Sequence, residues 1–224
     1  MRRRSRDGRD GEVAQDMEFQ QVVSSRRMVR NFESRPVPPH VTRRILENAV
    51  RAPSAGFTQG WSFLVLEGEE QTARFWDATF PVERREGFRW PGLFQAPLVI
   101  IPLVSKAAYV ERYAESDKGW VDRDETRWVT PYWFVDGGCS SMLMLLTAVD
   151  QGLGALFFGI FDLEAFRGAF GVDGAFHPLG GIAIGYPASD EPSRSLRRGR
   201  RPLEDVVHWG TWTPRVEPPA AGPL

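Results

Sequence analysis

The sequence has a single cysteine, Cys139, and no long uninterrupted apolar run. One cysteine excludes an intrachain disulfide framework and fits a reducing compartment, so we expect a cytoplasmic protein. The apolar runs fall short of the roughly 20 residues that a membrane-spanning helix needs. The N-terminus has arginines but not the apolar segment of a secretory signal. These absences predict a chain that has no membrane partner.

The sequence also lacks an excess of either charge and any metal-ligand pattern. Lysine and arginine number 28 against 29 acidic residues, which gives a formal net charge of −1. A nearly neutral chain is not expected to bind nucleic acid over its surface as a whole. The basic cluster around Arg200 could form a nucleic-acid patch, but no aromatic residues interleave it, so no nucleic-acid partner is predicted. His40, His177 and His208 are scattered and have no zinc-ligand spacing.

The 224 residues suffice for one domain of ordinary size. Residues 1–16 are mostly arginine, aspartate, glycine and glutamate with almost nothing to bury, so we predict that they are disordered. Met17 opens an amphipathic helix and is expected to be the natural start of the protein. The folded domain is predicted over residues 17–213, and residues 214–224 are predicted to be a flexible tail.

Apolar periodicity predicts helices that alternate with strands. Helices are predicted around Val22 and over residues 38–51, 69–80, 133–151 and 162–170, and strands over residues 61–66, 97–104, 155–159 and 181–186. Helix 133–151 is the most apolar and is predicted to be the central buried helix, with Cys139 in the core. Pro102 suggests that strand 97–104 lies at a sheet edge or contains a bulge. This order of elements predicts the α+β class or a three-layer αβα sandwich.

Three arginines, Arg26, Arg27 and Arg30, fall within five residues after the first helix. Guanidinium groups match phosphate with paired hydrogen bonds, and nearby backbone N–H groups can add to the contact. The segment therefore suggests a site for one anion. A solvated basic face near a helix C-terminus is the other interpretation, because arginine also suits the helix dipole there.

Three stretches, taken in order, resemble the FMN-dependent nitroreductase family. Residues 26–32 read Arg-Arg-Met-Val-Arg-Asn-Phe, similar to that family's Arg-Arg-Ser-x-Arg-x-Phe. Residues 52–61 read Ala-Pro-Ser-Ala-Gly-Phe-Thr-Gln-Gly-Trp, similar to Ala-Pro-Ser-x-x-Asn-x-Gln-Pro-Trp. The third stretch combines Gly-Leu-Gly at 152–154, Gly-Tyr-Pro at 185–187 and the basic segment 198–207. The resemblance implies a three-layer αβα sandwich with a central, mainly antiparallel sheet, and a homodimer in which both chains line each flavin site.

The resemblance also implies residues that bind FMN. In this family the N-terminal arginines and basic residues of the late tail hold the flavin phosphate, which corresponds here to Arg26, Arg27, Arg198 and Arg200. Arg30 would lie near the pyrimidine end of the flavin ring, where a cation stabilises the reduced form. The other candidate cofactor-binding residues are Met28, Pro53, Ser54, Ala55, Phe57, Gln59, Phe158 and Gly159. No catalytic or metal-binding side chain is predicted, because the flavin carries the chemistry.

Three positions depart from the family pattern. Met28 replaces the usual serine, which removes a side-chain hydrogen bond. Phe57 stands where an asparagine commonly binds the pyrimidine edge of the flavin, and Gly60 replaces the common proline. These departures leave flavin affinity, redox potential and substrate choice open.

The function that the resemblance implies is an FMN-dependent oxidoreductase that passes electrons from NADH or NADPH to a nitroaromatic, quinone or similar acceptor. Because both substrates use one site in turn, ping-pong kinetics are predicted. The alternatives are a flavin-binding storage protein with little turnover and an enzyme that uses a deazaflavin or acts on flavin itself. The aromatic segments 81–95 and 105–131 have no clean period. They could be simple packing or, as in the family, a lid over the substrate channel.

Overall fold

The computed structural model describes residues 17–189 and 191–213. These residues form two compact units, and the second begins at Glu191. The sheet and all the α-helices belong to the first unit. The predicted disordered segment 1–16 and flexible tail 214–224 lie outside the described residues, and the single domain over 17–213 stays a prediction.

The first unit is built on one antiparallel sheet, as predicted. The strands are β1 (Trp61–Glu67), β2 (Leu98–Val104), β3 (Gly154–Phe158), β4 (His177–Pro178) and β5 (Gly181–Gly185). They lie in the order β1-β2-β5-β3, and the short β4 pairs with β2. Each of these strand pairs is antiparallel. The α+β class is therefore confirmed, and the strand bounds differ from the predicted ones by only a residue or two.

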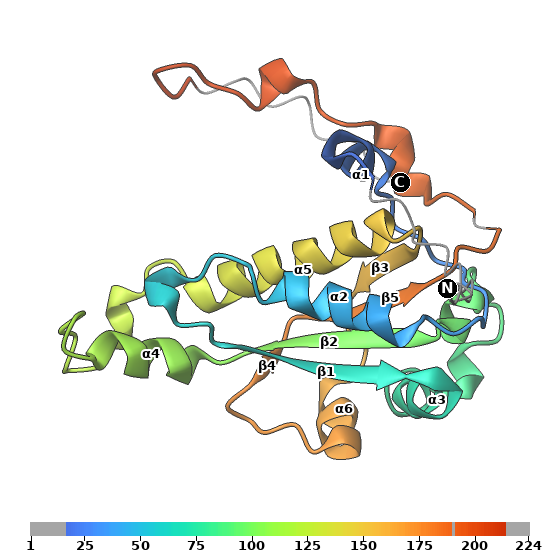
Figure 1. Cartoon of the computed structure of the whole chain (residues 1–224), viewed down its shortest axis with the longest axis horizontal. Coiled ribbons are helices and arrows are strands. Elements are labelled where there is room, and N and C mark those ends of the chain that lie inside the picture. Colours follow the sequence, from blue (N-terminus) through green and yellow to red (C-terminus); the bar gives the residue numbers. More distant parts are fainter. Residues whose placement is uncertain (1–16, 190, 214–224) are drawn as a thin grey trace, which may run out of the picture. The chain divides into compact units, whose positions relative to one another are not determined.

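Helices cover both faces of this sheet (Figure 1). They are α1 (Phe19–Ser25), α2 (Pro39–Ala49), α3 (Gly68–Thr79), α4 (Lys106–Ala114), α5 (Tyr132–Asp150) and α6 (Leu163–Phe170). Successive side chains of a strand point to opposite faces. Thus Ile100 of β2 packs in one cluster with Ile45 of α2 and Met144 of α5, whereas its neighbour Val99 packs in another with Phe75 of α3. This arrangement confirms the predicted three-layer αβα sandwich.

Strand β2 lies inside the sheet. This position corrects the prediction, based on Pro102, that the strand lies at a sheet edge. It pairs with β1 along its whole length, where Phe63 lies opposite Pro102. On its other side, residues 98–100 pair with β5 and residues 103–104 pair with β4. Pro102 therefore falls at the change of neighbour, so its missing N–H interrupts neither of those two pairings.

Only part of helix α5 is buried, which corrects the prediction of a wholly central helix. Met144 and Leu145 pack against the sheet. Another face carries apolar residues at alternating three- and four-residue spacing, which share one side of a helix: Val135, Cys139, Met142, Leu146 and Val149. Val135 and Met142 are 45% and 46% exposed, and the other three are half-buried. We call this face the α5 stripe, and Cys139 belongs to it rather than to the core.

By length and composition alone, α5 could cross a membrane. It has 19 residues, so the prediction that no apolar segment is long enough is wrong on length. However, 56% of its most apolar 18-residue window is buried inside the fold. The apolar residues of this buried part are explained by their packing against the sheet.

The second unit, described over residues 191–213, has two short 3-10 helices, Arg194–Arg198 and Leu203–Asp205. None of its described residues is buried. Five of its described apolar side chains are exposed, Leu196, Leu203, Val206, Trp209 and Trp212, and Val207 is half-buried. Apolar surface of this extent is typical of a segment that packs against a partner surface.

Candidate functional site

Residues 26–30 lie against the start of β3. The N–H of Val29 donates to the carbonyl oxygen of Ala155 over 3.0 Å, and Met28 forms an isolated parallel bridge with Ala155. Arg26 caps the C-terminus of α1. Backbone pairing therefore fixes the segment that carries the three arginines at one end of this strand.

Apolar packing explains two residues of this segment. The side chain of Met28 packs against both hydrophobic clusters of the sandwich. A Cβ added to Gly154 would lie only 2.7 Å from Cγ2 of Val29, so the close approach requires glycine. Methionine thus supplies core contacts where the family pattern has a serine.

Arg30 has two contacts that the sequence did not reveal. Its Nη1 donates to the carbonyl oxygen of Met28 over 3.2 Å. Its guanidinium lies 5.0 Å from the centroid of the Trp90 ring, and Arg89 lies 5.1 Å from the same ring. Cations are attracted to the face of an indole ring. The structure therefore holds Arg30 beside Trp90, against the interpretation of a fully solvated basic face.

The far end of β3 carries the predicted residues Phe158 and Gly159. Phe158 pairs with Gly181, and its ring stacks on Trp76 at 5.2 Å between centroids. Gly159 is exposed, and no atom lies within 4 Å of the place where its Cβ would be. A strand rises about 3.3 Å per residue, so Ala155 and Gly159 are about 13 Å apart. One edge of the sheet thus presents arginines at one end of β3 and uncovered backbone at the other.

The other predicted residues lie in the loop between α2 and β1, residues 53–60. Three of its residues have left-handed backbone: Gly56 at φ 62°, Phe57 at φ 53° and Gln59 at φ 52°. The N–H of Gln59 donates to Oγ of Ser54 over 2.8 Å, and this bond closes the loop. Phe57 is 75% exposed, an unusual place for a phenylalanine ring. The loop therefore exposes an aromatic ring. Phe57 and Gln59 hold a left-handed backbone conformation, which costs free energy in residues other than glycine.

A buried carboxylate, Asp136 of α5, lies beneath this loop. Its Oδ2 accepts hydrogen bonds from the N–H of Ala55 over 2.8 Å and from the hydroxyl of Tyr109 over 2.7 Å. Burial raises the pKa of Tyr109, and the hydrogen bond to Asp136 raises this pKa further. Tyr109 is therefore a hydrogen-bond donor at neutral pH.

Neither residue was predicted from the sequence, although each has a sequence signal. Tyr109 lies on α4, whose N-cap Ser105 accepts from the N–H of Ala108, a capping pattern that marks a helix start. Asp136 directly follows the apolar residues 132–135 near the start of α5. A carboxylate buried there requires hydrogen-bond donors.

The aromatic residues of segment 105–131 pack on one another. Tyr113, Trp120 and Trp128 lie with ring centroids 4.6–5.4 Å apart. The same segment carries ion pairs that join the following partners: Lys106 and Glu125, Arg112 and Asp117, Arg123 and Glu111, and Arg127 and Asp122. Packing is thus confirmed for these rings, and the lid over a substrate channel stays a prediction.

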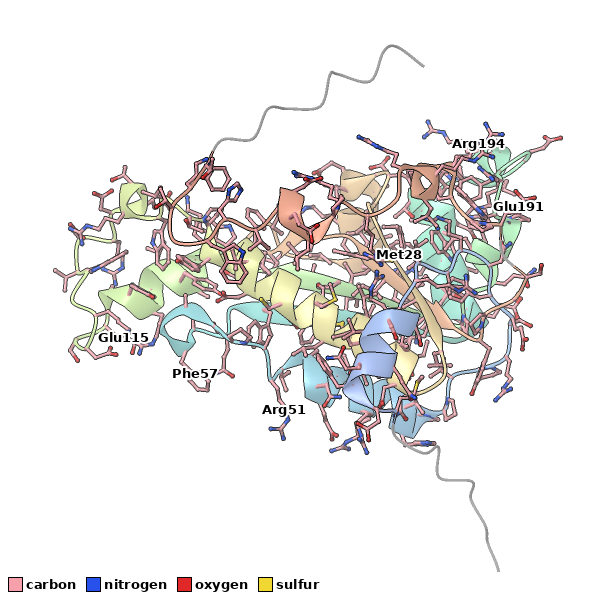
Figure 2. All side chains as sticks on the ribbon, turned by 90° about the horizontal axis from the view of Figure 1, so that it is seen from above. Met28, Arg51, Phe57, Glu115, Glu191 and Arg194 are labelled. Atoms are coloured by element: carbon pink, nitrogen blue, oxygen red, sulfur yellow. The ribbon has the colours of Figure 1, made fainter. Side chains whose placement is uncertain are left out.

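The structure does not bring all the predicted residues of the first unit together in one chain. The loop 53–60 contacts Asp136 near the start of α5, whereas Met28 contacts β3, just beyond the end of α5. Figure 2 shows Met28 and Phe57 well separated on the molecule. The fourteen-residue step from Asp136 to Asp150 spans about 20 Å of helix. The predicted residues of one chain thus form two groups, one at each end of α5, and we call these two groups the half-sites.

Arg198 and Arg200 belong to the second unit. Arg198 ends the first 3-10 helix of that unit, and both arginines are exposed. The structure describes them within their own unit, so their part in a phosphate site stays a prediction. Within the ranges 17–189 and 191–213, no three His, Cys, Asp or Glu side chains cluster in a way that could hold a metal ion.

Comparison with known proteins identifies the family. The model of the nitroreductase family matches residues 23–186, most of the chain. An NADH dehydrogenase of Thermus thermophilus is 30% identical over 205 residues, which cover 82% of this chain and 92% of that protein. An NADPH-dependent oxidoreductase of Staphylococcus aureus is 23% identical over 195 residues, 84% of this chain and 71% of the relative.

The fold agrees with this assignment. A protein of Exiguobacterium sibiricum, assigned as a nitroreductase and solved in complex with FMN, superposes with a TM-score of 0.65. The two are 23% identical, and the match covers 88% of this chain and all of the other. Since the family model covers well over half of the sequence and the sandwich is the same, this chain belongs to the nitroreductase family.

Proposed function

We propose that this protein is an FMN-dependent oxidoreductase that passes electrons from NADH or NADPH to a nitroaromatic, quinone or similar acceptor. The observation that carries the proposal is the pairing of the arginine segment 26–30 with β3, about 13 Å from the uncovered backbone of Gly159. The relatives named for NADH or NADPH dependence and the FMN-bound relative support it.

The side chains of this segment fit the cofactor. Guanidinium groups suit a phosphate, which Arg26 and Arg27 would bind. The backbone of Gly159 is exposed, and no atom lies within 4 Å of the place where its Cβ would be, so a flavin ring could approach it from that side. When bound, FMN would supply the redox chemistry, taking a hydride from the nicotinamide and passing electrons to the acceptor. Side chains of this protein would then bind and orient, and no side-chain nucleophile is required.

We further propose that the enzyme is a homodimer in which each site uses both chains. The half-sites of one chain are separated by about 20 Å of α5, so a partner is needed to complete either of them. A two-fold axis that packs α5 against α5 in opposite directions would bring the loop 53–60 of one chain to the arginines of the other. The α5 stripe lies between the two half-sites and offers the apolar surface for this contact.

Anaerobic reduction tests the proposed function. The purified protein should carry a yellow chromophore whose mass is that of FMN, and NADH or NADPH should bleach it. Adding a quinone or nitroaromatic should restore the colour, and initial rates should show the parallel lines of ping-pong kinetics. A protein that stores flavin would stay yellow in the presence of both nicotinamides, and a deazaflavin would be recognised by its mass.

Replacing Arg30 should make the bound flavin harder to reduce. A cation beside the pyrimidine end of the ring stabilises the charge of the reduced form. Arg30→Ala should therefore lower the two-electron midpoint by tens of millivolts, where about 30 mV corresponds to about 1.4 kcal/mol. Arg30→Lys should retain part of the effect, because it keeps the charge and loses the planar fork. Spectroelectrochemical titration measures the midpoints.

Arg89→Ala is the matched control for this experiment, since it removes the other guanidinium that lies over Trp90. Its midpoint should equal that of the wild type. If Arg30→Ala lowered only the melting temperature and left the midpoint unchanged, Arg30 would serve the fold through Trp90 and Met28 and would not face the flavin.

A further inference from the structure

The buried contacts of Asp136 join three elements of the fold. Asp136 on α5 is 4% exposed, and Tyr109 on α4 is 1% exposed. Both hydrogen bonds of the carboxylate, from Tyr109 and from the N–H of Ala55, end on the same oxygen, Oδ2. One buried atom therefore ties α4 and the loop 53–60 to α5.

Two tyrosine rings of α4 also constrain the loop, because they leave no room for a side chain at positions 56 and 60. A Cβ at Gly60 would lie 2.5 Å from Cε2 of Tyr109, and a Cβ at Gly56 would lie 2.6 Å from Cε2 of Tyr113. The two tyrosines are one helical turn apart, so they lie on the same side of α4. The presence of Tyr109 thus explains the glycine at position 60, where the family commonly has proline.

The loop depends on such contacts to keep its conformation. Phe57 and Gln59 have positive φ, which a residue with a side chain rarely adopts. Such backbone persists only where surrounding contacts hold it, and it gathers at ligand sites. Local bonds help, since the N–H of Phe57 donates to the carbonyl oxygen of Ser54 over 2.9 Å. The bond from Ala55 to Asp136 anchors the loop to a helix.

We propose that Asp136 and Tyr109 are positioning residues that hold the loop 53–60 in the conformation that binds the cofactor. This inference rests on the proposed function, in which Ser54, Ala55 and Gln59 lie beside the flavin. Neither Asp136 nor Tyr109 needs to touch the flavin. They would keep the loop ordered before the cofactor binds. The loop then loses less conformational entropy on binding, which raises the affinity for the cofactor.

Hydrogen exchange without flavin tests whether the pair orders the loop. In Asp136→Ala, the amides of residues 54–60 should exchange at least about tenfold faster than in the wild type, because the anchoring acceptor is gone. Tyr109→Phe keeps the ring beside Gly60 and removes only the hydroxyl, so it should fold and show a smaller increase. Asp136→Asn keeps one oxygen in the place of Oδ2 and should exchange as the wild type does.

Flavin titration of the same variants tests the effect on the cofactor. If the binding conformation is populated about a tenth of the time in Asp136→Ala, the dissociation constant for FMN rises about tenfold. At saturating FMN, kcat should return to within about twofold of the wild type, since the bound cofactor restores the loop. Asp136→Asn should recover wild-type affinity.

Ser141→Ala is the matched control, because Ser141 is buried on the same helix and donates only to the carbonyl oxygen of Gly137. It should leave both exchange and affinity unchanged. Unchanged exchange in both Asp136→Ala and Tyr109→Phe would overturn the inference, as would an equal loss of affinity in Ser141→Ala. A wild type that took up no flavin would instead overturn the proposed function, and the flavin-free exchange would still decide whether the pair holds the loop.

Discussion

Arg26→Ala should weaken FMN binding tenfold or more. The backbone of Arg26 caps α1 two residues before Met28, which bridges to Ala155 of β3, so Arg26 lies at one end of the proposed site. Losing a hydrogen bond to a charged group costs about 1.5–3 kcal/mol, and each 1.4 kcal/mol is tenfold in affinity. Titration of the flavin-free protein with FMN, followed by flavin fluorescence, measures the dissociation constant.

The control for this prediction is Arg43→Ala. Arg43 is an exposed arginine of α2 that pairs with Glu47 over 2.8 Å, so its loss changes the net charge equally and leaves the site intact. FMN affinity should not change in this variant. Arg198→Ala should weaken binding as Arg26→Ala does. The phosphate assignment would be wrong if the dissociation constant stayed the same in both Arg26→Ala and Arg198→Ala.

Met142→Asp should separate the dimer and release the flavin. Met142 is 46% exposed in the middle of the α5 stripe. Burying a carboxylate in an apolar interface without a partner costs several kcal/mol, and here the two-fold axis would place two of them close together. Light scattering should show the mass of one 25.3 kDa chain, where the wild type should show twice that mass. FMN should dissociate at the same time, because each site needs both chains.

Val82→Asp provides the comparison. Val82 is 62% exposed and lies in a short 3-10 helix outside the α5 stripe. Val82→Asp also places an aspartate on an exposed apolar position, and it should leave the dimer mass and the flavin content unchanged. A wild-type protein that has monomer mass with FMN bound would refute the dimer, and so would a Met142→Asp variant that stays dimeric.

The sequence predicted the fold well where periodicity was strong. Helix α5 and the strands β2 and β5 are rich in apolar residues, so their places and even their bounds followed from composition. The α-helix that was not predicted, α4, has aromatic residues on one side and charged residues on the other. Its apolar side faces a loop and not the sheet, which left no regular period to read.

The candidate site was predictable in its residues and not in its geometry. The arginine segment was found from its residues and the loop 53–60 by resemblance, but their separation along α5 is a property of three-dimensional packing. The contact between Arg30 and Trp90 joins segments that no local pattern connects. The role of Asp136 depends on Ala55 and Tyr109, which approach it from two other elements. Pairings of this kind between distant segments leave no trace in one sequence.

The close approach of Tyr109 to Gly60 restricts the order in which these two positions can change during evolution. A side chain at position 60 would overlap the tyrosine ring, so Gly60→Ala or Gly60→Pro is accepted only after the ring has been lost. Loss of the ring first is permitted sterically, because glycine tolerates any neighbour. A lineage that changes position 60 from glycine to proline must therefore replace Tyr109 before it makes that change. A lineage that changes position 60 from proline to glycine can gain the tyrosine only afterwards.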